Sequence, residues 1–134
     1  MHDDIWALIV EADAHSLIAI SNLLKELGIR YKRNTTGANV IEQIRRMQPR
    51  PHFILLDLDL PQGDARLISK LIERDHIIGG IPVIAIAQTT ALDRPSHLQR
   101  SGFAGFIRKP LPRHQFGDMI AHVLQGGDLW EARV

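Results

Sequence analysis

The 134-residue chain contains no cysteine, which excludes disulfides, thiolate zinc sites, iron–sulfur clusters and a cysteine nucleophile. The chain has no excess of charge of one sign, because it contains 16 Lys and Arg residues and 15 Asp and Glu residues. General nucleic-acid binding requires an excess of positive charge, so the composition argues against it. Its longest apolar stretch, Ile81–Ala87, is far shorter than the roughly 20 residues that span a bilayer. Residues Met1–Trp6 include two aspartates and no basic segment, unlike a secretory signal. These absences predict a cytoplasmic protein without nucleic-acid or membrane partners.

What is present is enough apolar sequence for one core. Apolar residues make up 45% of the chain, too many for a disordered segment, and the length suits a single domain. We find no internal repeat, low-complexity tract or linker between domains. The pair Gly126-Gly127 is expected to end the fold. We therefore predict one domain over residues 1–127 and a short C-terminal tail over residues 128–134, with no output domain after it.

Short apolar runs alternate with segments of helical periodicity along the chain. The expected strands span residues 6–10, 29–34, 53–56, 82–87 and 103–107. The expected helices span residues 17–27, 40–47, 67–72, 95–101 and 112–124, with Gly28 at a helix C-terminus. Parallel neighbours need crossover helices, and nearly continuous apolar strands fit a sheet covered on both faces. The pattern predicts an α/β fold with a doubly wound, five-stranded parallel sheet.

Charged residues follow these strands where open α/β sheets place their sites. Glu11 and Asp13 follow the first strand, Asp57 and Asp59 the third, and Lys109 the fifth. Such a group of carboxylates with one lysine can hold Mg²⁺, which prefers hard oxygen ligands. An aspartate beside the metal can then attack phosphorus and form an aspartyl phosphate.

Purely structural interpretations compete with these roles. Asp13 and Asp64 each directly precede an expected helix and can serve as N-caps, and Thr90 with Asp93 fits a capping box. Asp57 is harder to explain structurally, since an acid that ends a buried strand is costly unless a group pairs with it. Lys109 could be no more than that partner.

Four motifs, in their order and spacing, are specific. They are LIVEAD at 8–13, FILLDLDLP at 53–61, IPVIAIA at 81–87 and GFIRKP at 105–110. Over residues 5 to about 125 the chain resembles the receiver domain of two-component response regulators. The resemblance implies a flavodoxin-like sheet in the order 2-1-3-4-5.

By this resemblance Asp57 is the phosphoacceptor. Glu11, Asp57 and the backbone carbonyl of Asp59 would hold Mg²⁺, with Asp13 as a further candidate ligand. The family usually has a second acidic metal ligand where this chain has Ala12, so magnesium binding is expected to be weaker than usual.

The resemblance also implies how phosphorylation is sensed. Lys109 would contact the phosphoryl group, followed by Pro110 across a cis peptide bond, and Phe106 stands at the family's aromatic switch position. The usual Thr or Ser at the end of the fourth strand is replaced by Ala87, which removes the hydroxyl that links phosphorylation to the switch.

The leading hypothesis is a stand-alone receiver, not an enzyme, that accepts a phosphoryl group from a sensor histidine kinase or a histidine phosphotransfer protein. It would signal by protein contact. The stretch 94–117 carries five Lys and Arg residues and no acid, either as a solvated face or as a docking surface for a downstream partner. Self-association into a homodimer is a further expectation for this face. The alternative, indicated by Ala12 and Ala87, is a pseudo-receiver that binds partners independently of phosphate.

Two other classes fit less well. The sequence Asp57-Leu58-Asp59 matches the DxD motif of haloacid-dehalogenase-type phosphatases, but here it follows the third strand and no late acidic pair appears. A flavin or nucleotide carrier needs a phosphate-binding loop after the first strand, where this chain has acids. The seven histidines show no metal-ligand spacing.

Overall fold

A computed structural model of the chain describes residues 4–88 and 95–130. Five parallel strands form one sheet in the order β2-β1-β3-β4-β5, as the sequence predicts. The strands are β1 Trp6–Val10, β2 Arg30–Asn34, β3 Phe53–Asp57, β4 Val83–Ala87 and β5 Gly105–Arg108. The helices are α1 Ala14–Glu26, α2 Val40–Arg46, α3 Ala65–Arg74, α4 Pro95–Arg100 and α5 Phe116–Leu124.

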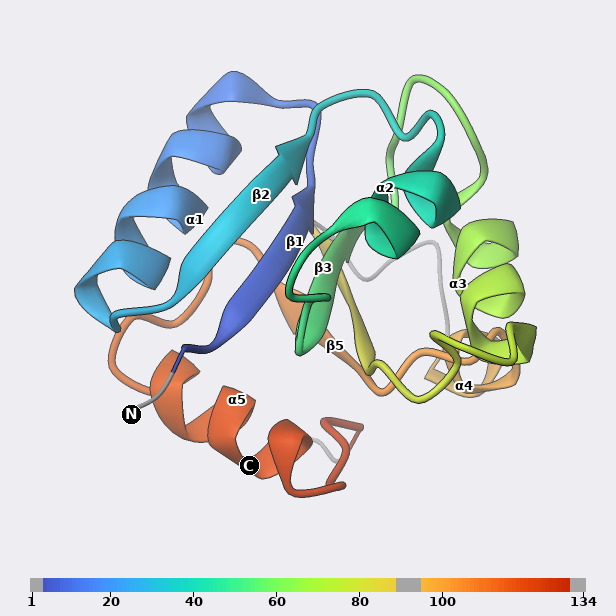
Figure 1. The fold of residues 1–134 in the computed structure, drawn as a ribbon. Coiled ribbons are helices and arrows are strands. Elements are labelled where there is room, and N and C mark those ends of the chain that lie inside the picture. The colour runs from blue at the N-terminus through green and yellow to red at the C-terminus, as the bar shows by residue number, and fades with distance from the viewer. Residues whose placement is uncertain (1–3, 89–94, 131–134) are drawn as a thin grey trace.

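Helices cover both faces of the sheet, with α1 and α5 on one side and α2, α3 and α4 on the other (Figure 1). Successive residues of a strand point to opposite faces, so each inner strand contributes to two apolar cores. In β3, for example, Phe53 and Leu55 pack on the α1 and α5 side, whereas Ile54 and Leu56 pack on the other. All five β3 residues are buried, which explains its uninterrupted apolar sequence.

Local sequence signals set several helix ends as expected. Asp13 caps α1, and its carboxylate accepts a hydrogen bond from the Ser16 N–H at 2.8 Å. Asp64 caps α3, because its carboxylate accepts from the Arg66 N–H at 3.0 Å. Gly28 follows the end of α1 with a φ of +74°, a left-handed conformation that glycine adopts without strain. The competing capping interpretation of Thr90 and Asp93 lies outside the described residues.

Other boundaries differ from the prediction. The last helix begins at Phe116 and not at residue 112, because residues 112–115 form a separate turn closed by Gln115 N–H donating to the Pro112 carbonyl. The described part of the expected C-terminal tail lies against the sheet. There Leu129 forms a parallel bridge with Gly105 and donates its N–H to the Ala104 carbonyl.

Candidate phosphoacceptor site

The carboxyl ends of β1, β3 and β5 bring Glu11, Asp57 and Lys109 together, as the sequence predicts for a parallel sheet. Asp57 is the last residue of β3, and Glu11 and Lys109 directly follow β1 and β5. The Lys109 Nζ lies 2.7 Å from Glu11 Oε1 and 3.1 Å from Asp57 Oδ2. One ammonium group therefore bridges two carboxylates from strands that are distant in sequence.

The three side chains of this triad are almost completely buried. The Glu11 side chain has no exposed surface, and those of Asp57 and Lys109 are 5% and 8% exposed. Burial, with the Asp57 carboxyl beside it, raises the pKa of Glu11 to about 7. Burial opposes the charge on Lys109, but its hydrogen bond to Glu11 and the charge of Asp57 hold the pKa of Lys109 above its ordinary value. Pairing thus keeps Lys109 charged, whereas burial disfavours the charged form of Glu11.

The remaining carboxylate oxygens are satisfied by the backbone of the adjacent loops. Asp57 Oδ1 accepts from the N–H of Asp59 at 2.9 Å, and Glu11 Oε2 accepts from the N–H of Asp13 at 3.0 Å. These contacts orient both carboxyl groups. The Asp59 side chain itself is exposed.

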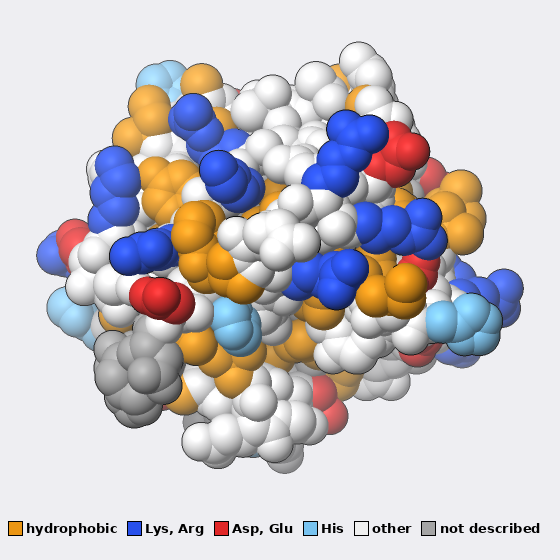
Figure 2. Space-filling model, viewed as in Figure 1, with side chains coloured by type: hydrophobic (Ala, Val, Ile, Leu, Met, Phe, Trp, Pro, Cys, Tyr) orange, Lys and Arg blue, Asp and Glu red, His pale blue; other side chains and the backbone are white. Residues whose placement is uncertain are grey.

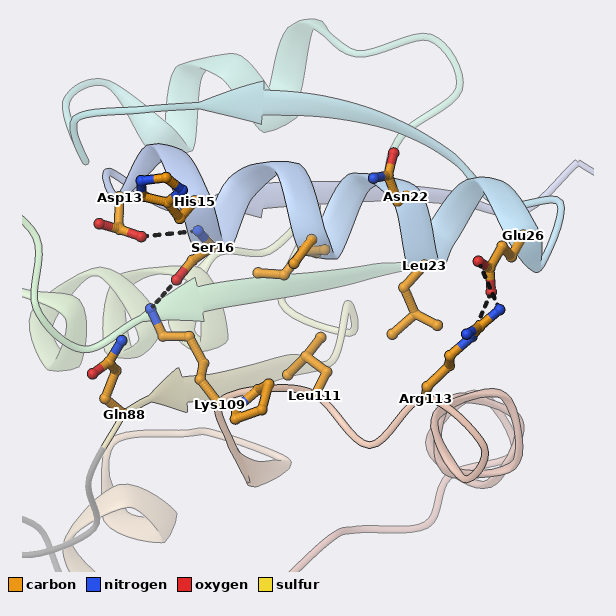
Figure 3. A pocket seen from close by; sticks show the side chains of 13 residues that line it. Asp13, His15, Ser16, Asn22, Leu23, Glu26, Gln88, Lys109, Leu111 and Arg113 are labelled. Carbon is orange, nitrogen blue, oxygen red and sulfur yellow. Dashed lines mark hydrogen bonds and ion pairs between the residues drawn. The ribbon is translucent and has the colours of Figure 1, made fainter.

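Asp13 plays a local role in the described contacts. The hydrogen bond from the Ser16 N–H lowers the pKa of Asp13, which keeps the N-cap charged. The sequence did not single out Ser16, whose hydroxyl lies 3.5 Å from the Lys109 Nζ (Figure 3). No sequence motif marks this proximity, which arises because α1 begins beside the end of β5.

A pocket of about 540 Å³ opens beside the triad, between α1 and the loop that follows β5. Lys109 and Gln88 lie at one end of this pocket, and Glu26 and Arg113 pair across the other end (Figure 3). Between the two ends, the lining includes apolar side chains such as Leu111. Of the triad, only Lys109 lines this open surface, which has an apolar middle and a polar rim.

The switch positions are brought to one side of the sheet. Phe106 pairs in register with Ala85, and Arg108 with Ala87, so the side chains of Phe106 and Ala87 point to the α4 face. Ala87 is buried and Phe106 half-buried. The Ala87 carbonyl accepts from the Lys109 N–H at 2.8 Å, and the Lys109–Pro110 bond is cis, as expected. No hydroxyl is available at position 87.

The stretch 94–117 does not form one continuous basic face, contrary to one reading of the sequence. Lys109 is buried in the triad, and Arg113 makes two hydrogen bonds to Glu26 on α1. Arg100, Arg108 and Arg113 are exposed, whereas Arg94 lies outside the described residues. The physical reason is that consecutive cations on a strand and its following loop project in different directions.

The donor set at the sheet edge suits a hard cation but is small. Glu11, Asp57 and the Asp59 carbonyl provide oxygens, and Mg²⁺ usually keeps several waters beside few protein ligands. Among residues 4–88 and 95–130, no group of three or more His, Cys, Asp or Glu side chains is arranged to hold a metal. Glu11 and Asp57 are the two buried carboxylates at this edge, so an Mg²⁺ ion held there would take its other ligands from water and backbone carbonyl groups.

Comparison with known proteins identifies the family. The model for the response regulator receiver domain matches residues 7–121, and the chain belongs to this family. This family and its fold are those of a two-component signalling domain, not of a classical enzyme. Within the described chain no helix is long and apolar enough to cross a membrane.

Similar proteins differ widely in length. The polar-differentiation response regulator DivK of Brucella anthropi is 25% identical over 87% of this chain and 94% of its own length. An uncharacterised 76.5 kDa protein of Thiocystis violacea is 31% identical over 79% of this chain, which spans only 15% of that protein.

Solved structures show the same fold. A response regulator from Chloroflexus aurantiacus superposes with a TM-score of 0.82 at 17% identity, over 92% of this chain and 99% of its own. The receiver domain of the sensor histidine kinase PA1611 from Pseudomonas aeruginosa, solved with magnesium in its active-site cleft, has a TM-score of 0.77 at 22% identity and covers 92% and 97%.

Proposed function

We propose that this receiver accepts a phosphoryl group on Asp57 from a phosphohistidine and relays the signal by protein contact. The observation that carries the proposal is the Lys109 ammonium held 3.1 Å from Asp57 Oδ2 at the end of a buried strand. A lysine that only neutralised a buried carboxylate would not need to line an open pocket. Here the same lysine lines that pocket.

In the proposed transfer, an Asp57 carboxylate oxygen attacks phosphorus and forms a P–O bond. The P–N bond of the phosphohistidine breaks, and its electron pair returns to the imidazole nitrogen. The Lys109 ammonium, which already contacts Asp57, then donates to a phosphoryl oxygen and offsets part of its charge. The N–H of Asp59 keeps the acceptor carboxyl oriented.

Glu11, Asp57 and the Asp59 carbonyl are the groups that would hold Mg²⁺, whose chemistry when bound is to neutralise charge on the phosphoryl oxygens. Glu11 accepts a hydrogen bond from the Lys109 ammonium, and this contact holds the ammonium beside Asp57. Asp13 stays a candidate ligand, although its described hydrogen bond is to α1.

The test is the intact mass after incubation with phosphoramidate or acetyl phosphate and Mg²⁺. We expect one phosphoryl adduct in the native chain and none in Asp57→Asn. The matched control is Asp59→Asn, which removes an exposed carboxylate two residues away and keeps the backbone groups. An adduct in Asp57→Asn, or its absence from a folded native chain at high Mg²⁺, would refute the proposal.

A second candidate function is a phosphate-independent binding module. Ala12 lowers the negative charge of the metal site, and the buried Ala87 offers no hydroxyl to couple phosphorylation to Phe106. In that case Asp57→Asn would bind the downstream partner as well as the native chain. Loss of binding in the folded variant would exclude this function.

We further propose that the donor is a histidine kinase or phosphotransfer protein of the cytoplasm, docked where the pocket leads to Lys109. The output surface would include α4 and β5, where Arg100 and Arg108 are exposed and Phe106 is half-buried. A homodimer through the same surface is a variant of this proposal. Sedimentation with and without phosphoramidate tests it, since a phosphorylation-dependent dimer would change mass only in the phosphorylated sample.

A further inference from the structure

Cations dominate the surface over β2 and α2, on the opposite edge of the sheet from β5. Figure 2 shows Lys and Arg side chains gathered across this face, with fewer Asp and Glu among them. The exposed cations here are Arg30, Lys32, Arg33, Arg45, Arg46 and Arg50, called the basic edge below. Between residues 27 and 56 the sole acidic residue is Glu42, although acids and bases nearly balance over the whole chain.

Most of this positive charge is not neutralised within the chain. Arg45 pairs with Asp75, and the Arg30 guanidinium lies 3.9 Å from Asp4 Oδ1 and 5.8 Å from the ring centre of Trp6. The other four members of the basic edge make no ion pair with any residue in 4–88 or 95–130. Surfaces of stable domains usually intersperse both signs, so a patch of one sign favours an anionic partner.

The basic edge is also an open edge of the sheet. The Arg30 N–H and the Asn34 carbonyl bond toward β1, and in a parallel ladder every second residue does so. The backbone groups of Tyr31 and Arg33 therefore point away from β1. Within the described chain, the Gln43 side chain donates to the Arg33 carbonyl, and no other hydrogen bond to these outward groups is present.

The end of β2 is held rigidly. The Asn34 side-chain oxygen accepts from the N–H groups of Thr36 and Gly37, and its amide donates to the Ala38 carbonyl and to Gln43. A strand whose end is fixed in this way needs little reordering when another strand is added. Less ordering cost leaves more of the interaction free energy for binding.

We propose that the basic edge binds an acidic, extended segment of a partner protein, which adds to β2 as a sixth strand. Free amide and carbonyl groups of the edge match the backbone of a strand, and Arg30, Lys32 and Arg33 match acidic side chains on it. A nucleic acid or a lipid headgroup supplies phosphates but no complementary row of donors and acceptors. Like charge on two copies of β2 opposes self-pairing, so the edge selects a different, acidic chain.

The test uses the full chain and a fluorescein-labelled octapeptide of paired Glu and paired Val residues (EEVVEEVV), which presents Glu on both faces of the added strand, with binding followed by anisotropy at low salt. We expect Lys32→Glu/Arg33→Glu to weaken binding at least about tenfold, which corresponds to about 1.4 kcal/mol. The matched control, Lys25→Glu/Arg74→Glu, makes the same change of charge on exposed residues of α1 and α3 and should bind as the native chain does. Lys32→Gln/Arg33→Gln serves as the variant if the charge reversal unfolds the strand.

Backbone pairing is tested with the same peptide N-methylated at alternate residues, which keeps its charge and removes the N–H donors. Binding should fall, and the unmodified peptide should slow hydrogen exchange of the Tyr31 and Arg33 amides. Equal binding of both peptides, or equal loss of binding in both double variants, would overturn strand addition. Tighter binding of heparin or of anionic phosphatidylserine vesicles than of the acidic peptide would also overturn it, as would no binding of the peptide.

Discussion

Introducing a carboxylate at position 12 should lower the Kd for magnesium and lower the thermal stability of the metal-free domain. Ala12 is exposed and follows the buried Glu11, whose pKa burial already raises to about 7. In the triad, one Lys109 ammonium serves two carboxylates, so a third acid in Ala12→Asp has no described cation to pair with. Without metal, the new carboxylate therefore repels the carboxylates of Glu11 and Asp57. With metal, it attracts the bound Mg²⁺.

The magnitude follows from the triad geometry. Glu11 Oε1 and Asp57 Oδ2 contact the same Nζ at 2.7 and 3.1 Å, which places them within about 6 Å of each other. If the new carboxylate at position 12 lies at the same separation from one of them, two unit charges at an effective dielectric constant of about 20 interact by about 3 kcal/mol, and solvent exposure of residue 12 reduces this to about 1 kcal/mol. An equal gain in attraction to Mg²⁺ corresponds to about a tenfold lower Kd.

The assay is a thermal melt in EDTA and along a MgCl₂ titration, with isothermal calorimetry for the Kd. Without metal, Ala12→Asp should melt about 3 °C below the native chain. With saturating Mg²⁺, Ala12→Asp should melt above the native chain, because Mg²⁺ bound more tightly stabilises the folded state more. Ala12→Asn is the control, with nearly the same volume and no charge. Equal Kd values for Ala12→Asp and Ala12→Asn would refute the reasoning, since position 12 would then not act through its charge.

Three further predictions address the loops and the triad. Gly37→Ala should cost about 2 kcal/mol in urea unfolding, because φ is +94° and a Cβ would lie 2.0 Å from the Gln62 carbonyl oxygen; an unchanged midpoint would contradict this. The pKa of Asp75, lowered to about 2 by backbone N–H groups and Arg45, gives stability that is present above pH 4 and lost toward pH 2; Asp75→Asn should flatten the melting temperature across that window. Lys109→Met should cost about 3 kcal/mol by leaving two buried carboxylates unpaired, whereas Lys70→Met, at a half-buried lysine paired with the more exposed Glu73, should cost much less.

Much of the fold could be predicted because its signals are local. Apolar runs of strand length between helical patterns require crossovers, and crossovers require a parallel sheet whose carboxyl ends share one edge. This reasoning places Glu11, Asp57 and Lys109 at one edge without coordinates. The caps at Asp13 and Asp64 follow from side chains that bond to the next turn.

Some contacts of the charged side chains could not be predicted from the sequence, because they depend on how each side chain is directed toward elements distant in the chain. Nothing local indicates that Lys109 bridges two carboxylates while Arg113 turns to Glu26, so a run of cations looked like one face. The start of the last helix at Phe116 was missed because residues 112–115 form a turn that resembles a helical start in sequence.

The sequence by itself thus determined the architecture, the proposed acceptor at Asp57 and the two departures at Ala12 and Ala87, because residue identity and local pattern carry them. Only the tertiary structure decided the charge balance of the triad and the pocket beside it. The same holds for the concentration of unpaired cations along β2, the open edge of the sheet. These properties are set by strand register and by which face each side chain takes, and both become defined only when the sheet is assembled.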